Sequence, residues 1–272
     1  MKYISTKINV PNLYYNDSVA FLFMVTRDLV KEHIWKKWFE SLPINYNIYV
    51  HCSDPTKIKS EWLKKYLIPY NIPTTWNSHM EAELTLYRYA LKNTNDSWFI
   101  NLSETTVPYI SPKKFSTFFR ELKTKSMLTY KRPWWSKSEN NRANLLMFPP
   151  DARFGNNEWC VLCNEDVRTI MYLWDYTPIV KTMIDGPHAD ESIFSVSLYI
   201  GNNFKNNIKT DTTIIDWERT TNYGNSPHVF TDWDKEDKKF VKDFVEQNPY
   251  TMFIRKVSPD FPDSVILKWT KL

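Results

Sequence analysis

The chain has only four glycines, and this scarcity excludes several common nucleotide-binding folds. They are Gly155, Gly186, Gly201 and Gly224, and no two of them share one short loop. The dinucleotide-binding G-x-G-x-x-G turn, the kinase glycine loop and the P-loop all need clustered glycines so that backbone N–H groups can reach a phosphate. If this protein binds a phosphate, charged side chains must hold it.

The composition is that of an ordinary globular protein. With 272 residues, the chain is long enough to bury a core without disulfides or metal ions. An apolar fraction of 42% against 24% charged residues excludes a disordered chain. The net charge of +4, without a run of Lys or Arg, gives no indication of nucleic-acid binding. The 12 Trp and 16 Tyr make sugar binding a reasonable function, because flat rings stack on sugars.

Three cysteines, Cys52, Cys160 and Cys163, give an odd number and predict no disulfide framework, which fits a reducing compartment. Cys160 and Cys163 fall in a predicted strand at 158–163, where residues three apart point to opposite faces. We therefore expect buried thiols rather than a shared metal site.

No signal peptide or membrane span is visible in the sequence. The most apolar early run, Val19–Val25, is far shorter than the roughly 20 residues that a spanning helix needs. We therefore expect a soluble, cytoplasmic protein. Few glycines with many Asn, Lys and Ile residues also suggest an AT-rich coding genome, such as that of a large DNA virus or a protist.

Buried strands alternate with helices through the first half of the chain. Continuous apolar runs predict strands at 19–25, 46–50 and 97–102. Apolar residues at helical spacing predict helices at 28–39, 57–67 and 80–91. This alternation predicts an α/β fold with a mainly parallel sheet. We find no linker or repeat and expect a single domain over residues 1–272.

The second half is less regular. The segment 131–157 predicts a functional loop. Strands are expected at 158–163, near 212–215 and at 251–257, with a charged helix at 235–247. The polar residues at the ends of the first three strands are expected to bind a ligand, as strand ends do in α/β sheets; they are Thr26, Arg27, His51, Ser103 and Glu104.

Asp190 and Glu191 precede an apolar helical pattern, and we expect both in the first turn of a buried helix. One interpretation is structural, because carboxylates favour the positive end of a helix dipole. The other is chemical, because an ionised carboxylate there can take a proton from a substrate hydroxyl.

Two further positions also have a structural and a functional interpretation. Arg255 and Lys256, at the end of an apolar strand, are either a solvated sheet edge or a clamp that neutralises a leaving diphosphate. Trp217 is either a core residue or a stacking surface for a sugar.

A catalytic metal ion is not expected. The run from His188 to Glu191, together with the C-x-x-C, differs in spacing and order from the zinc deaminase pattern. The D-x-D of Asp232 and Asp234 lies late in the chain, and the segment after the third strand offers one acid, Glu104. A metal-dependent hydrolase is therefore a distant alternative.

Taken in order, these segments resemble the core-2/I-branching glycosyltransferase family (family 14), especially its plant branch. Order and approximate spacing hold from about residue 18 to 260. The matching segments are Val19–Arg27, Tyr46–His51, Trp98–Pro108, Gly155–Trp159, Ala189–Glu191, Ile215–Trp217, Pro227–His228 and Phe253–Lys256.

The resemblance implies a GT-A-type fold and an inverting, metal-independent transferase that uses a UDP-sugar and a glycan acceptor, with no other cofactor. It implies a donor-binding half at about 18–130 and an acceptor and catalytic half at about 131–260. Glu191 matches the base that deprotonates the acceptor hydroxyl. The predicted donor-binding residues are Val25, Thr26, Arg27, His51, Arg255 and Lys256, and the predicted acceptor-binding residues are Trp217, Arg153 and Trp159.

Two departures from the family pattern matter. His51 agrees with the plant branch, whereas animal members carry Asp there. A phosphate-binding Arg soon after the Pro-His pair of the animal enzymes has no counterpart in Pro227–Phe230. The main alternative is therefore a non-catalytic, carbohydrate-binding module. The donor sugar, a hexose, N-acetylglucosamine or a pentose, and the oligomeric state are not predicted by the sequence.

Overall fold

The computed structural model describes residues 15–135, 142–221 and 226–272. The strands are β1 (Asn16–Val25), β2 (Asn45–Cys52), β3 (Asp96–Ser103), β4 (Val107–Pro108), β5 (Ser126–Met127), β6 (Tyr130–Lys131), β7 (Gly155–Asn156), β8 (Val161–Cys163), β9 (Asn207–Ile208), β10 (Thr213–Ile214) and β11 (Phe253–Ile254). The α-helices are α1 (Glu32–Glu40), α2 (Glu61–Lys64), α3 (Met80–Asn93), α4 (Pro112–Leu122), α5 (Asn164–Tyr176), α6 (Pro178–Ile184), α7 (Ile193–Ile200), α8 (Lys235–Gln247) and α9 (Asp263–Thr270). Short 3₁₀ helices are η1 (Pro55–Lys57), η3 (Arg142–Met147), η4 (Pro150–Ala152), η5 (Ala189–Glu191) and η6 (Phe204–Asn206).

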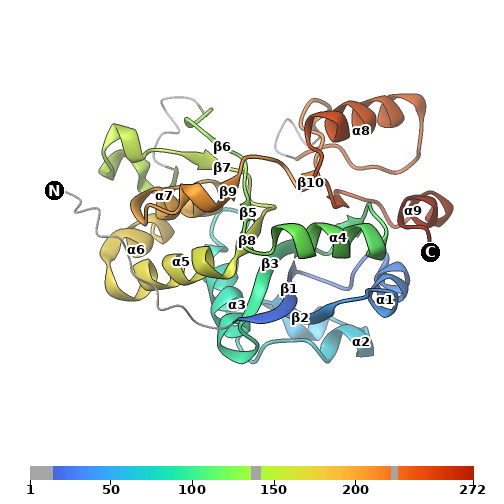
Figure 1. Cartoon of the computed structure of the whole chain (residues 1–272), viewed down its shortest axis with the longest axis horizontal. Helices are drawn as coiled ribbons and strands as arrows, with labels where there is room; N and C mark the ends of the chain where they lie inside the picture. The colour runs from blue at the N-terminus through green and yellow to red at the C-terminus, as the bar shows by residue number, and fades with distance from the viewer. Residues whose placement is uncertain (1–14, 136–141, 222–225) are drawn as a thin grey trace.

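The main sheet has the strand order β2-β1-β3-β8-β5-β9 (Figure 1). β1 lies between β2 and β3 and is parallel to both. β5 and β9 are also parallel, whereas β8 is antiparallel to β3 and β5. The predicted α/β fold with a mainly parallel sheet flanked by helices is therefore confirmed, and it is consistent with a GT-A-type fold.

Helices cover both faces of this sheet, which explains the continuous apolar run of β1. Phe21 and Phe23 pack in a core with α1 and α4, whereas Ala20 and Leu22 pack on the other face with α3. Aromatic rings fill the first core: Phe21 meets Trp38 of α1 edge-to-face at 5.8 Å between ring centroids.

A second, smaller sheet has the order β10-β11-β4. Its core contains Ile214 and Ile254, and Val241 of α8 and Ile266 of α9 pack against them. Figure 1 shows α8 and α9 at the opposite end of the molecule from α6 and α7.

Two predicted helices are shorter than expected. The helix expected at 28–39 begins only at Glu32, because the Asp28 carboxylate accepts hydrogen bonds from the backbone N–H groups of Lys59 and Ser60, each at 3.0 Å. The helix expected at 57–67 is reduced to η1 and α2. Its first part is interrupted because the backbone N–H groups of Lys59 and Ser60 bind Asp28, and its last part instead pairs with β2. Val50 exchanges backbone hydrogen bonds of 2.9 Å with residues 66 and 68.

The helices expected at 80–91 and 235–247 are confirmed as α3 and α8, and the strands expected at 46–50 and 97–102 as β2 and β3. The strand expected at 158–163 is limited to Val161–Cys163, and those near 212–215 and 251–257 to β10 and β11. The segment 131–157 contains only short elements in its described part; residues 136–141 lie outside the described residues.

The cysteine prediction is confirmed. Cys52, Cys160 and Cys163 are buried and free. Cys160 packs in the core on the α3 face of the sheet and Cys163 in the core on the α1 face, so the two thiols point to opposite faces.

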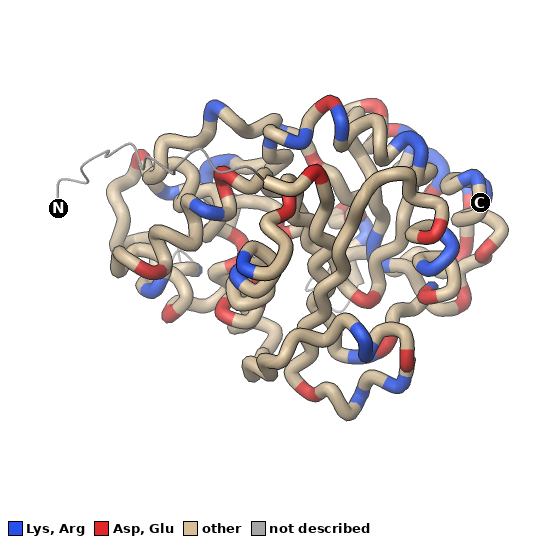
Figure 2. The backbone as a smooth tube through the Cα atoms, turned by 60° about the horizontal axis from the view of Figure 1, so that its bottom comes forward, with Lys and Arg blue, Asp and Glu red and all other residues tan. Residues whose placement is uncertain are grey.

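Basic and acidic residues are interspersed along the backbone (Figure 2). Among the helices of the described ranges, none has both the length and the apolar character required to cross a membrane. The division into two halves within a single domain stays a prediction.

Candidate active site

The ends of three parallel strands meet at one edge of the main sheet. In the strand register, Met24 of β1 lies opposite both His51 of β2 and Ser103 of β3. One residue beyond β1, the Thr26 hydroxyl donates a hydrogen bond of 3.0 Å to the Glu104 carboxylate. Parallel strands bring their carboxyl ends together, so the sequence correctly grouped these residues.

Arg27 and Thr26 are exposed beside this edge, whereas His51 is buried. Burial lowers the pKa of His51, which favours the neutral imidazole. His51 is therefore a hydrogen-bonding group of the strand edge rather than a cation.

Arg255 and Lys256 reach the same region from the small sheet. They directly follow β11, and the next residue, Val257, donates a backbone hydrogen bond of 2.9 Å to the carbonyl of Thr105, just beyond β3. Lys256 is half-buried and donates to the Ser226 hydroxyl at 2.8 Å. Burial and the positive charge of Arg255 lower the pKa of Lys256, and Glu104 and Glu158 oppose this shift.

The guanidinium of Arg255 stacks on an aromatic ring. Its central carbon lies 4.0 Å from the centroid of the Trp159 ring, a cation–π contact. Arg255 is buried, and burial lowers its pKa to about 10, while Glu158 and Glu104 favour the charged form. A desolvated guanidinium is thus held in a fixed position between the strand edge and Glu158.

The acidic pair does not lie where the sequence predicted. Asp190 and Glu191 form the turn η5, and Ser192 separates this turn from α7, so they are not in the first turn of the helix. The left-handed backbone of His188 (φ 52°) begins the turn. The Asn156 amide donates a hydrogen bond of 2.7 Å to the Asp190 carbonyl and accepts one of 3.1 Å from the Ser195 N–H. These two bonds hold η5 as a turn separate from α7.

Backbone contacts hold the 186–191 segment from two sides. On one side, Ala143 N–H donates to the Pro187 carbonyl at 2.7 Å; on the other, His188 N–H donates to the Asn77 carbonyl at 2.9 Å. A Cβ on Gly186 would lie 2.5 Å from the Asn144 nitrogen, so only glycine allows this close approach. The segment is therefore clamped between η3 and the turn before α3.

This packing places Arg142 next to Glu191, and their side chains form a hydrogen-bonded ion pair. The pair is partly accessible, with 22% of the Arg142 side chain and 26% of the Glu191 side chain exposed. Arg142 was not among the predicted site residues.

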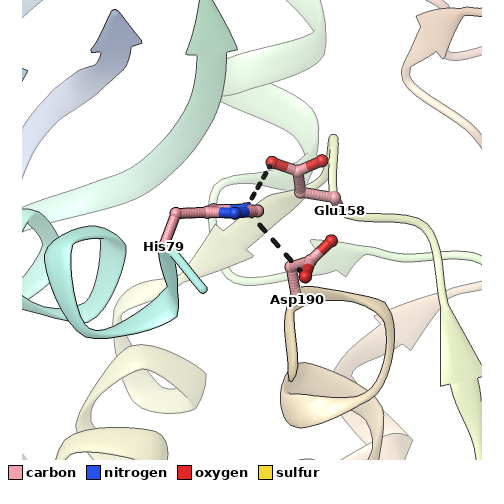
Figure 3. A group of neighbouring side chains, drawn as sticks. All are labelled: His79, Glu158 and Asp190. Atoms are coloured by element: carbon pink, nitrogen blue, oxygen red, sulfur yellow. Dashed lines mark ion pairs between the residues drawn. The ribbon is translucent and has the colours of Figure 1, made fainter. Parts of the chain in front are cut away.

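The carboxylate of Asp190 instead joins His79 and Glu158 (Figure 3). His79 Nε2 lies 3.4 Å from Glu158 Oε1 and 4.0 Å from Asp190 Oδ1. The three side chains come from the start of α3, the segment before β8 and η5, so three distant segments meet in one cluster.

Glu83 extends this cluster. It lies four residues after His79, on the same face of α3, and its buried carboxylate accepts a hydrogen bond from Asn101 of β3. Burial raises the pKa of Glu83 well above its usual range, and the charge of Glu158 adds to the increase.

Among the other residues of the cluster, His79 carries a positive charge near neutral pH. Burial lowers the pKa of His79, but Glu158, Asp190 and Glu83 outweigh burial and raise it to about 10. Burial and the charge of Glu158 raise the pKa of Asp190 to about 7, although His79 opposes this. An imidazolium between two carboxyl groups is therefore the expected state at neutral pH.

The ligand atoms of His79, Glu158 and Asp190 all lie within 4.8 Å of one another, a spacing that a divalent cation could bridge. The imidazolium already supplies positive charge at this point, and the buried Arg255 interacts with Glu158 as well. The cluster is thus electrically compensated by its own side chains.

The predicted acceptor residues lie in different environments. Trp217 is exposed, and the carboxylate of its neighbour Asp216 accepts a hydrogen bond from the Arg219 side chain. Arg153 donates to the carbonyls of Phe148 and Leu146, and Trp159 is covered by Arg255. Their roles as acceptor contacts, and the donor role of Val25, which is buried at the end of β1, stay predictions.

Sequence reasoning missed His79, Glu83 and Glu158. The i,i+4 spacing of His79 and Glu83 at the start of a predicted helix was the one local signal that could have drawn attention to them. Glu158 lies directly before Trp159 in the sequence, and no local pattern indicates a role for it.

One of the comparisons with known proteins finds a family. The family model described as "Branch: Core-2/I-Branching enzyme" matches residues 19–245, a range that extends from the first strand of the sheet into α8 and includes His79, Glu158 and Glu191. A search of curated proteins finds no match.

Proposed function

The chain belongs to the core-2/I-branching enzyme family of glycosyltransferases, and from this premise we propose that it transfers a sugar from a UDP-sugar to the hydroxyl of a glycan or glycoconjugate. The family match over residues 19–245 is the observation that carries the proposal. The meeting of a cation pair, strand ends and a carboxylate turn in one region supports it.

The proposed reaction is a single displacement with inversion. The acceptor O–H gives its proton to the Glu191 carboxylate, and the oxygen forms a bond to the anomeric carbon of the donor sugar. The bond between that carbon and the β-phosphate oxygen breaks, and its electron pair leaves with UDP. Only one base and one positive clamp are needed.

Accessibility favours Glu191 over Asp190 as the base. The Glu191 side chain is 26% exposed, whereas the Asp190 side chain is 12% exposed and is turned toward His79. A substrate hydroxyl can reach the first carboxylate more easily than the second. Arg142, paired with Glu191, holds this carboxylate in position.

Lys256 and Arg255 are the proposed clamp on the departing diphosphate, with Arg27 at the open strand edge as a further donor contact. Two side-chain cations can supply the charge that a metal ion supplies in other nucleotide-sugar enzymes. The proposed reaction therefore requires no metal cofactor.

A UDP-release assay tests the proposal directly. The protein is incubated with UDP-linked N-acetylglucosamine, glucose, xylose or glucuronate and a panel of oligosaccharide acceptors. Acceptor-dependent release of UDP from one donor, with an inverted anomeric configuration in the product by NMR, is the expected result. Glycan binding without UDP affinity would favour the non-catalytic, carbohydrate-binding alternative.

A further inference from the structure

A rigid turn just before α3 presents an exposed tryptophan. Thr75 and Ser78 exchange two backbone hydrogen bonds, of 3.1 and 3.2 Å, and the Thr75 hydroxyl donates to the Asn77 side chain at 2.8 Å. Trp76 lies within this closed turn and is 70% exposed. Such exposure of an indole leaves a large apolar surface in water, which a bound ligand could cover.

The turn is joined to the segment that carries the acidic pair. His188 N–H donates to the Asn77 carbonyl at 2.9 Å, and the ring of His188 meets that of Trp76 edge-to-face, with centroids 4.8 Å apart and planes at 78°. Glu191 N–H in turn donates to the His188 carbonyl at 3.2 Å. Only one tight turn of backbone therefore separates the residue that touches Trp76 from Glu191.

The same turn continues into the acid cluster. His79, the residue after Ser78, contacts Glu158 and Asp190. The backbone around Trp76 is thus fixed at Thr75, at Asn77 and at His79. A ring held in this way loses little freedom when a ligand stacks on it, so it can contribute its full contact area to binding.

We propose that Trp76 is a stacking surface for a pyranose ring at the transfer site. This inference rests on the proposed function, because it assigns a sugar subsite beside the proposed base. The C–H groups on one face of a pyranose match the flat apolar face of an indole, while the sugar hydroxyls stay free for Glu191 and for water. The pyranose belongs either to the acceptor or to the donor, and the experiment below separates the two.

Other exposed tryptophans are less suited to this role. Trp134 is half-exposed, but it packs on Gly155 and Trp135 and lies under Lys131. Trp217 is 56% exposed and follows β10 of the small sheet, away in sequence from both the turn at residues 75–78 and η5. The contact of Trp76 with His188 distinguishes it from both.

The test compares Trp76→Ala and Trp76→Phe with the matched control Tyr176→Ala, at the end of α5, where the ring is 74% exposed. Kinetics with the active UDP-sugar give separate KM values for donor and acceptor. Saturation-transfer NMR with methyl β-galactoside, methyl β-N-acetylglucosaminide and methyl β-xyloside gives a second readout that needs no catalysis. Thermal unfolding checks that each variant is folded.

If the acceptor stacks on Trp76, Trp76→Ala raises the acceptor KM about tenfold, leaves the donor KM unchanged, and is partly rescued by Trp76→Phe. If the donor sugar stacks, the variant instead weakens the binding of UDP-sugar but not of UDP. Both results support the proposal. It is overturned if both KM values and the NMR signals stay within twofold of the wild type, or if Tyr176→Ala changes them equally.

Failure of the proposed function looks different. A wild-type protein that releases no UDP with any donor would contradict sugar transfer. Loss of the methyl glycoside signals in Trp76→Ala would still support a sugar subsite at Trp76, and their persistence would overturn it.

Discussion

Asp190 and Glu191 are adjacent in the chain, yet their carboxylates face different partners. Asp190 is buried and lies 4.0 Å from His79 Nε2, whereas Glu191 is partly accessible and pairs with Arg142. The two carboxylates differ in this way because both residues lie in the short turn η5, where consecutive side chains leave the backbone in different directions. One carboxylate holds the turn in place, and the other is available to a substrate.

From this arrangement we predict that Glu191→Gln lowers the transfer rate by about 10²–10⁴-fold, the contribution expected of a general base. Affinity for UDP should not change, because the amide keeps the size of the side chain. Steady-state kinetics and calorimetric titration with UDP check both expectations. Glu246→Gln, exposed on α8, is the matched control. Retained turnover in Glu191→Gln would remove Glu191 from the catalytic role.

Lys256→Ala is expected to weaken UDP binding by about tenfold or more, because a half-buried, charge-assisted contact with a phosphate is lost. Titration of the variant with UDP and with uridine measures this. The effect should appear with UDP and not with uridine, which has no phosphate. Lys242→Ala, on the exposed face of α8, should leave both affinities unchanged. An unaltered affinity for UDP in Lys256→Ala would contradict the clamp.

Removal of metal ions should leave the reaction intact. Dialysis against EDTA is expected to change the transfer rate by less than twofold and the melting temperature by less than about 1 °C, since ligand loss lowers the melting temperature only if a metal was bound. Elemental analysis of the protein before and after dialysis supports the comparison. Activity that disappears and returns only with added Mn²⁺ or Zn²⁺ would contradict this prediction and would make His79, Glu158 and Asp190 the first candidates for metal ligands.

Local patterns predicted the fold better than the site. The apolar run of β1 predicts a strand buried on both faces, and the register with β2 and β3 then determines which polar residues meet at the strand ends. Arg255 and Lys256 could be selected from the sequence as candidate phosphate-binding residues because they follow an apolar strand. The limits of the two shortened helices depend on Asp28, whose bonds to Lys59 and Ser60 join distant segments.

The acid cluster and the Arg142–Glu191 pair depend on contacts between segments far apart in the chain. Glu158 and His79 are 79 residues apart, and no periodicity in either segment indicates that they meet. From the sequence alone, Gly186 can be explained as a residue that ends a helix. Only the structure shows that it allows the backbone of residues 143–144 to approach.

Gly186→Ala should therefore destabilise the protein and weaken catalysis together. The added Cβ would lie 2.5 Å from the Asn144 nitrogen, so the backbones must separate, and we expect a decrease of about 1–3 kcal/mol in the free energy of unfolding. Urea denaturation measures this decrease, and kinetics should show a lower rate as Arg142 moves away from Glu191. Lys181→Ala, exposed on α6, is the control. A variant as stable and active as the wild type would contradict the close packing.

The last prediction concerns the pH dependence of stability. The folded protein raises the pKa of His79 from the ordinary value of 6.5 to about 10. Between these values the native state binds more protons than the unfolded state, so the free energy of unfolding decreases as pH rises. The contribution of His79 is complete below about pH 6.5 and is lost toward pH 10. We expect it to be on the order of 5 kcal/mol.

Urea denaturation at several pH values between 8 and 9.5 tests this expectation, with His79→Gln as the variant. The ionisable side chains that face His79 are Glu158, Asp190 and Glu83, and the Asp190 carboxyl titrates mainly below pH 8 because its pKa is about 7. The wild type should lose stability steeply across the range, whereas His79→Gln should lose little. His33→Gln removes an exposed histidine that pairs with Asp263 and should reproduce the wild-type slope. Equal slopes for wild type and His79→Gln would show that His79 is not held as an imidazolium by the two carboxylates.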